Sequence, residues 1–215
     1  VPHLTAATVS TTALTKGWKR LNDIEGATAT LTGLGNSAAD VATIMEDANA
    51  AVKGTAFGLG DAVKTASTAV AAGVRPGEEL QRVLSTVADT AAITGDNIGD
   101  MGTIFNSVLS RGALKGDDLM QLQSRGLPVL QLVADQMGVT AEEASKMASE
   151  GAISFQIFEE ALRNRVGGAA QDAGATVKGS MDNVGAALGR VGAMVEGPLF
   201  KLLPAALGLV TTGID

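Results

Sequence analysis

An all-α fold is predicted by this sequence: a compact array of short helices that end at glycines, with a longer C-terminal Gly/Ala-rich helix and an apolar tail. Apolar residues recur at intervals of three and four, the period of a helix with one buried face. Glycine accounts for 27 of the 215 residues, and it repeatedly follows these periodic segments, as glycines at helix C-caps do. Weak strand-like alternation is confined to residues 27–35.

The overall composition fits a folded, acidic protein. Hydrophobic residues make up 46% of the chain and charged residues 18%, which is enough apolar surface for a core and excludes compositional disorder. The net charge of −7 argues against a nucleic-acid-binding surface, which needs a basic patch. The basic cluster Lys16, Lys19 and Arg20 is interpreted as a solvated helix face. The absence of cysteine excludes disulfides and thiolate metal sites.

The first helix is expected over about residues 13–26, after an irregular Thr-rich lead-in. Leu14, Trp18, Leu21 and Ile24 follow one another at spacings of four, three and three, so they share one face. Trp18, the only tryptophan, is predicted to be a core anchor because its side chain can bury a large area. The alternative is an anchor that faces a partner.

Residues 27–35 allow two interpretations, a short strand or a turn before a helix cap. Gly33, Gly35 and Ala38 match the loose dinucleotide-binding pattern G-x-G-x-x-A. That pattern requires a strand before it and an acidic residue about 20 positions later. Only the following helix is convincing, so a turn with Asn36 or Ser37 as the N-cap is the favoured interpretation.

The chain is divided into three predicted parts by these signals. Within the middle part, four helices are expected over about residues 37–52, 60–73, 76–95 and 97–112. Phe105 lies on the apolar stripe of the last of these and is predicted to be a core anchor. The three parts are 1–35, the lead-in and first helix; 36–167, a helical module; and 168–215, the Gly/Ala-rich helix with the apolar segment.

Residues 115–163 carry the densest helix start and stop signals. Asp117 and Asp118 place negative charge at a helix start, where unpaired N–H groups favour it. A second helix follows Pro128, whose missing N–H suits a first helical turn. Leu130 and Val133 are its predicted core anchors.

Two further helices are expected before residue 167. Thr140 and Glu143 form a T-x-x-E capping box, in which each side chain binds the other residue's backbone N–H. Gly151 is expected to end this helix, and Ser154 to cap the next one. Phe155 and Phe158, three residues apart on one face, are predicted to be core anchors.

The C-terminal part is rich in glycine and alanine, and a long helix is expected over about residues 176–195. Gly185, Gly189 and Gly192 lie along one ridge, and this spacing lets a second helix pack closely. The apolar run 198–214 is short for a membrane span and contains Pro204, so a helix buried by the fold or by a neighbouring subunit is favoured. The predicted helix-packing or oligomer contacts are Gly185, Gly189, Gly192, Leu199, Phe200 and Leu203.

Catalytic chemistry is not visible in the sequence. The one histidine, His3, falls in the lead-in, and no G-x-S-x-G nucleophile motif occurs. Three adjacent acidic pairs stand out, and neighbouring residues do not face each other on a helix, so these acids are interpreted as capping or solvated groups. The pairs are Asp117/Asp118, Glu142/Glu143 and Glu159/Glu160. We therefore predict that the chain is not an enzyme and has no catalytic, cofactor-binding or metal-binding residues.

A family resemblance runs along nearly the whole chain. Its centre is GALKGDDLMQLQSRGLPVLQLVADQMGVTAEEASKMASEGAISFQIFEEAL, in which four steps follow in order at Gly126–Pro128, Gly138–Glu143, Ser149–Ser154 and Phe155–Phe158. The front segment KGWKRLNDIEGATATLTGLGNSAADVATIMEDA and the exit segment GAALGRVGAMVEGPLF also match. The chain thus resembles the tape measure proteins of long-tailed phages, those of actinobacteria in particular.

This resemblance implies a structural role in the virion. Tape measure proteins run along the phage tail lumen, help set tail length during assembly in the host cytoplasm, and leave before the DNA at genome ejection. The implied partners are tail tube and tail tip proteins, tail assembly chaperones and further copies of the chain, with three as one option. Specific nucleic-acid binding is not expected. The alternative is a membrane-active segment, with membrane contact of the C-terminal run, that is released at infection to aid DNA passage. We also expect this chain to be part of a longer protein.

Overall fold

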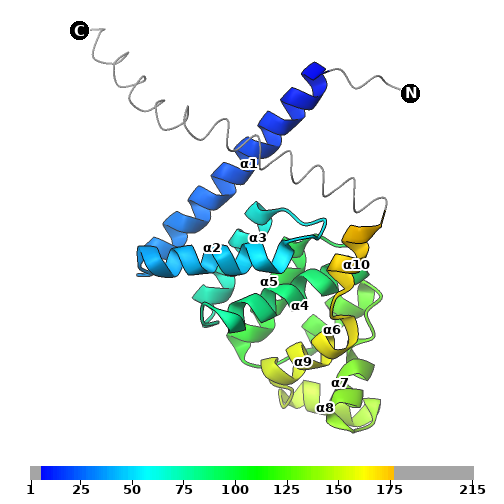
Figure 1. Cartoon of the computed structure of the whole chain (residues 1–215). Helices are drawn as coiled ribbons and strands as arrows, with labels where there is room; N and C mark the ends of the chain where they lie inside the picture. Colours follow the sequence, from blue (N-terminus) through cyan, green and yellow to red (C-terminus); the bar gives the residue numbers. More distant parts are fainter. Residues whose placement is uncertain (1–5, 177–215) are drawn as a thin grey trace, which may run out of the picture.

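The computed structural model describes residues 6–176, with side chains for Trp18 and for residues 21–176 (Figure 1). The secondary structure in this range is helical apart from one isolated β-bridge. The predicted all-α array is therefore confirmed here, whereas the expected helix over 176–195 and the apolar tail lie outside the described residues. The helices are α1 (Ala6–Gly33), α2 (Ala38–Val52), α3 (Leu59–Ala71), α4 (Glu78–Thr94), α5 (Ile98–Arg111), α6 (Gly116–Ser124), α7 (Val129–Met137), α8 (Ala141–Glu150), α9 (Phe155–Val166) and α10 (Ala169–Ala175).

The helix ends follow from local sequence chemistry. Gly112 and Gly151 take the left-handed backbone conformation just after α5 and α8, at φ of 72° and 75°. This conformation lets the chain turn away from a helix and strains other residues. Before α8, the Thr140 N–H donates to the Glu143 carboxylate at 2.8 Å and the Glu143 N–H donates to the Thr140 hydroxyl at 3.2 Å. The predicted capping box is therefore present.

The longest helix differs from the sequence prediction. α1 is continuous over 28 residues, so the lead-in is helical from Ala6 and residues 27–33 are not a strand. Ala27 and Leu31 are buried where α1 packs on α3, and this burial outweighs the modest helix propensity of the Thr- and Gly-containing segment. Gly35 then turns the chain at φ of 89°, and Ser37 caps α2, as the turn-and-cap interpretation predicts.

One hydrophobic core runs through the described helices, with α4 in the middle. α4 contacts α2, α5, α9 and α10, while α3 lies between α1 and α5. α3 and α5 lie close together at Gly102, where an added Cβ would collide with the Thr65 side chain. A glycine at this position is therefore a requirement of the helix crossing, in addition to the glycines that end helices.

The segment α6–α8 extends from this core and returns to it. At its base, the Leu114 N–H donates to the Ile153 carbonyl at 2.9 Å and the Phe155 N–H donates to the Gly112 carbonyl at 3.3 Å. These bonds pair the loop before α6 with the loop after α8. α7 packs on α9, and α8 packs on α7, so α8 forms the end of the module opposite to α1 (Figure 1).

Candidate interaction surfaces

The predicted aromatic anchors meet in one cluster. Phe105 and Phe158 are buried with ring centroids 5.0 Å apart, and Phe155 packs on both at 6.5 and 6.3 Å. Val133 is buried, and Leu130 is partly buried against the core. The cluster joins α5 to α9, whose phenylalanines lie 50 and 53 positions apart in the sequence, so these side chains hold α6–α8 against the core.

Trp18 does not anchor the core of the described module, contrary to the prediction. Its side chain is 49% exposed. Ala27 lies nine positions after Trp18, and nine positions correspond to about two and a half helical turns. Trp18 therefore lies on the side of α1 opposite to the Ala27 side, which packs on α3. The periodicity identified an apolar stripe correctly, but α3 covers a different face.

The predicted helix-packing residues Gly185, Gly189, Gly192, Leu199, Phe200 and Leu203 all lie outside the described residues. Their role in packing or self-association stays a prediction.

Buried acidic residues are the feature that the sequence reasoning missed. Glu159 was interpreted as capping or solvated, yet it is only 2% exposed. Its carboxylate accepts a hydrogen bond from the Thr86 hydroxyl at 2.8 Å and lies 3.5 Å from Arg82 and 3.3 Å from Arg163. These contacts connect α4 to α9. A clue in the sequence was the Glu159/Arg163 pair at i, i+4, but Arg82 and Thr86 are more than 70 positions away.

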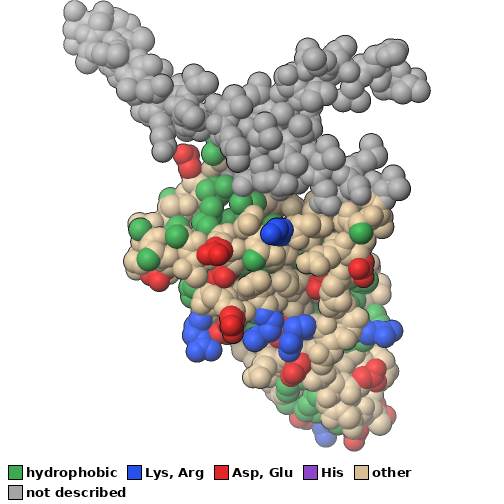
Figure 2. Space-filling view, in the orientation of Figure 1, with side chains coloured by type: hydrophobic (Ala, Val, Ile, Leu, Met, Phe, Trp, Pro, Cys, Tyr) green, Lys and Arg blue, Asp and Glu red, His purple; other side chains and the backbone are tan. Residues whose placement is uncertain are grey.

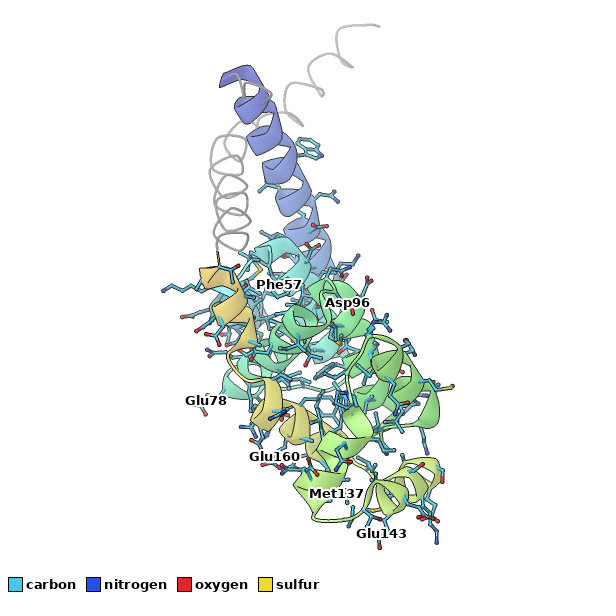
Figure 3. All side chains as sticks on the ribbon, turned by 90° about the vertical axis from the view of Figure 1, so that its right-hand side faces the viewer. Phe57, Glu78, Asp96, Met137, Glu143 and Glu160 are labelled. Carbon is cyan, nitrogen blue, oxygen red and sulfur yellow. The ribbon has the colours of Figure 1, made fainter. Side chains whose placement is uncertain are left out.

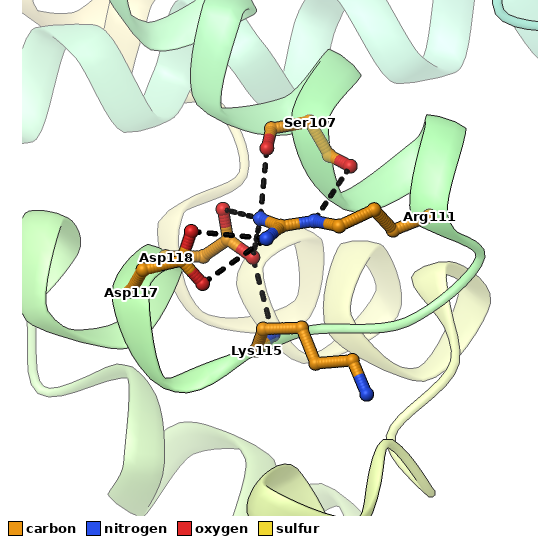
Figure 4. A network of polar contacts seen from close by, with 5 residues as sticks. All are labelled: Ser107, Arg111, Lys115, Asp117 and Asp118. Atoms are coloured by element: carbon orange, nitrogen blue, oxygen red, sulfur yellow. Dashed lines mark hydrogen bonds and ion pairs between the residues drawn. The ribbon is translucent and has the colours of Figure 1, made fainter.

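A second polar network fixes the start of α6 to the end of α5 (Figure 4). The Arg111 guanidinium contacts Asp118 at 2.5 Å, Asp117 at 2.9 Å and the Ser107 hydroxyl at 2.8 Å. The Asp118 carboxylate, fully buried, also accepts the Lys115 N–H at 3.1 Å. The pKa of Asp117 is lowered, chiefly by its hydrogen bonds from Arg111. Arg111 is thus the cationic partner of the buried Asp118 side chain.

Two other buried carboxylates serve backbone N–H groups. On α4, Asp89 accepts the N–H groups of Gly168 and Ala170 at 3.0 and 2.8 Å, so it supplies the N-cap that α10 lacks in its own sequence. On α2, Asp47 accepts the Gly77 N–H at 2.6 Å. Burial raises the pKa of Asp47, although the Gly77 hydrogen bond opposes the rise. Both contacts join helices rather than forming an open site.

The chemistry of these groups is structural. Each buried carboxylate described above is held by a cation, a hydroxyl or backbone N–H groups of a neighbouring helix. Among residues 6–176, no group of three or more His, Asp or Glu side chains is placed to hold a metal ion. Within the same range, none of the helices combines the length and apolar character that crossing a membrane requires.

The exposed surface carries charged side chains and a few large hydrophobic side chains. Lys and Arg side chains lie mostly in a band across the lower half of the face seen in Figure 2, with Asp and Glu side chains among and around them. Figure 3 places Glu143 at the end of the module far from α1. The large hydrophobic side chains that are exposed in the described residues are Trp18, Leu34, Ile93 and Met120.

Residues 6–176 thus form an all-helical module whose buried polar groups join its own helices. The family model described as "Tape measure protein" matches residues 15–196, which is most of the chain. The chain therefore belongs to the tape measure protein family, structural components of phage tails that interact with other tail components. No curated protein and no solved structure gave a significant match.

Proposed function

We propose that this chain is a compact helical module of a tape measure protein and lies in the tail lumen. There it would contribute to the control of tail length, to tail assembly and to genome delivery. The observation that carries the proposal is the family match over residues 15–196 on a chain that folds into short capped helices around one core. The module spans residues 36–167 in this proposal, and the parts before and after it connect it to the rest of the tail.

The module is not the length-setting part of the ruler. An unbroken helix of its 132 residues (36 to 167) would extend about 200 Å, at 1.5 Å per residue. The helices in this range, α2–α9, have only 9–17 residues each and fold back on one another. A compact domain of this size has a radius of gyration of about 14 Å. The module therefore adds far less length than its residue count would give.

Tail length tests this proposal directly. A second copy of residues 36–167 is inserted in frame beside the first in the full protein, and the tails of the resulting phage are measured by electron microscopy. We expect tails to lengthen by far less than about 200 Å, the length of an equally long helix. The control is an inserted helical segment of equal residue number, which should lengthen tails by the full amount. Lengthening by the module to the same extent would overturn the proposal.

The proposed location and partners need separate measurements. A lumenal chain should resist protease in intact tails and become sensitive after the tails are opened, while sensitivity in intact tails would contradict the lumen. Cross-linking mass spectrometry of tails should detect cross-links between the chain and the tube and tip proteins. In extracts of infected cells, the same method should detect cross-links between the chain and the assembly chaperones. Self-association, with three copies as our proposal, would appear in analytical ultracentrifugation. The net charge of −7 would limit binding to DNA that passes through the tube.

The second proposal is a membrane-active role for the C-terminal apolar run. The run 198–214 carries Lys201 as its one charged residue, which favours contact with a lipid surface. The chain should then cause leakage of liposomes, and a variant with Lys and Asp placed along the run should not. Equal leakage by both variants would count against this role.

A further inference from the structure

The helix α8 is attached to the module in a different way from the helices around it. Buried carboxyl groups tie α6, α9 and α10 to other helices, at Asp118, Glu159 and Asp89. Among the described residues, the hydrogen bonds of the α8 side chains stay within residues 140–150, and these side chains form no ion pair. No polar side-chain contact therefore fastens α8 to the rest of the described module.

The apolar contact that holds α8 is also small. The buried residues of α8 are two alanines, Ala144 and Ala148, and Met147 is partly buried. An alanine side chain is a single methyl group, which buries little apolar area. The helix on which α8 packs is α7, at the end of the module (Figures 1 and 3). Elements with few buried contacts are the ones that open most easily.

The side of α7 that α8 covers is defined by a hydrogen bond on the other side. The Asn164 amide of α9 donates to the Gln136 side chain at 2.9 Å. Two positions turn a helix by about 200°, so Ala134 lies on the side of α7 that faces away from α9. Ala134 and Ala144 are both fully buried, yet they lie outside the continuous core. Since α8 packs on α7, we infer that α8 covers Ala134.

Both ends of α8 have the chemistry of a hinge. Gly138 and Gly151, which precede and follow it, have positive φ values of 68° and 75°, and hinges commonly lie at such helix ends. The bonds that cap α8 are local, because the Ala152 N–H donates to the Met147 carbonyl at 2.8 Å and the capping box lies within the first turn. Directly after the second hinge, the fully buried Ile153 fixes the chain to the core.

We propose that α8 is a lid on α7: it swings away as a unit about Gly138 and Gly151 and uncovers Ala134, while the other helices stay packed. With the lid closed, the end of the module presents charged side chains such as Glu142 and Glu150, which are exposed. With the lid open, it presents an apolar side of α7 instead. This lid does not depend on the proposed role in the tail.

Thiol labelling measures the opening, because the chain contains no cysteine. Ala134→Cys places a thiol under α8, and Val133→Cys places one at the adjacent position of α7, in the continuous core. The full chain of each variant reacts with N-ethylmaleimide in buffer and in low urea, and mass spectrometry follows the labelling. We expect the thiol of Ala134→Cys to react at least about 100-fold faster than that of Val133→Cys, because local opening costs less than unfolding of the module. Its rate should depend little on urea, since the opening exposes little surface.

A second substitution loosens the lid itself. Ala144→Asp, combined with Ala134→Cys, places a carboxyl group between α8 and α7. Labelling should become about tenfold faster or more, because the closed state would bury a polar group without a partner. The urea midpoint of the module should stay unchanged. Ser145→Asp is the matched control, since it places the same side chain at an exposed position of α8 and should leave the labelling rate unchanged.

Three outcomes would overturn the proposal. Equal labelling rates for Ala134→Cys and Val133→Cys would mean that α7 opens together with α8. An unchanged labelling rate in Ala144→Asp would mean that α8 does not control access to Ala134. A much lower urea midpoint in Ala144→Asp would mean that α8 unfolds with the core. If Ala134→Cys does not fold, Ala148→Cys, on the α8 side of the contact and equally buried, carries the same comparisons.

Discussion

Replacing Arg111 by alanine should reveal how strongly the buried Asp118 depends on its cation. Arg111 contacts Asp118 at 2.5 Å, and the Asp118 side chain is fully buried. Without the guanidinium, the buried Asp118 side chain would keep the hydrogen bond from the Lys115 N–H at 3.1 Å but would have lost its cationic partner. The expected consequence is a large loss of stability, localised at the junction of α5 and α6.

The size of the loss follows from burial. Removing one partner of a buried ion pair typically costs about 3–5 kcal/mol. The Arg111 side chain is 35% exposed, and water can reach the site it leaves, so we expect the lower end, about 3 kcal/mol. With a urea m-value of about 2 kcal/mol/M, the unfolding midpoint would fall by about 1.5 M. The contact with Asp117 adds little, because that side chain is 57% exposed.

Urea unfolding followed by circular dichroism measures this loss, and three variants interpret it. Asp117→Asn, the control for the exposed contact, should lower the unfolding midpoint much less, because solvent screens an exposed ion pair. Arg111→Lys keeps the charge but not the bidentate geometry and should fall between the two. Arg111→Ala combined with Asp118→Asn should recover part of the loss, since no buried charge remains. An Arg111→Ala midpoint no lower than that of Asp117→Asn would refute the reasoning.

Three further predictions concern single positions. Gly102→Ala should cost about 1–3 kcal/mol through overpacking against the facing threonine of α3, while Gly116→Ala, where a Cβ meets nothing within 4 Å, should not destabilise; thermal unfolding of both variants decides. The pKa of Glu143 is below its ordinary value because the Thr140 N–H and hydroxyl bind its carboxylate. This contact stabilises the fold above the ordinary pKa of a glutamate, and the stabilisation is lost as the pH falls through the lowered pKa. Thr140→Ala should therefore raise the pKa of Glu143 in a carboxyl NMR titration, and an unchanged pKa would contradict the prediction. Burial raises the pKa of Asp47, so the ionised carboxylate destabilises the fold once the pH rises above the ordinary pKa of an aspartate. Asp47→Asn should therefore be more stable than the unchanged chain at neutral pH, but not at a pH below that ordinary pKa. Urea unfolding at both pH values measures the difference.

The sequence predicted the helix boundaries of the module well because they depend on residues close in the chain. A capping box such as Thr140 with Glu143 forms between neighbours three positions apart, and it forms wherever that segment is helical. The glycines after α5, α7 and α8 act through their own backbone conformation. The apolar stripes that carry Phe105 and Phe158 also follow from local periodicity, and both side chains are buried.

Tertiary structure decided which apolar stripe became buried and which acidic side chains became buried. On α1, packing against α3 selects the Ala27 side and leaves Trp18 exposed, a choice that periodicity within α1 cannot make. Glu159 is buried because Arg82 and Thr86 of α4 come within bonding distance, and no local pattern reports a partner more than 70 positions away. Local sequence therefore determined where helices start and stop, since those hydrogen bonds close within a turn. The partners of each face depended on the whole chain, because burial is a property of the packed helices together.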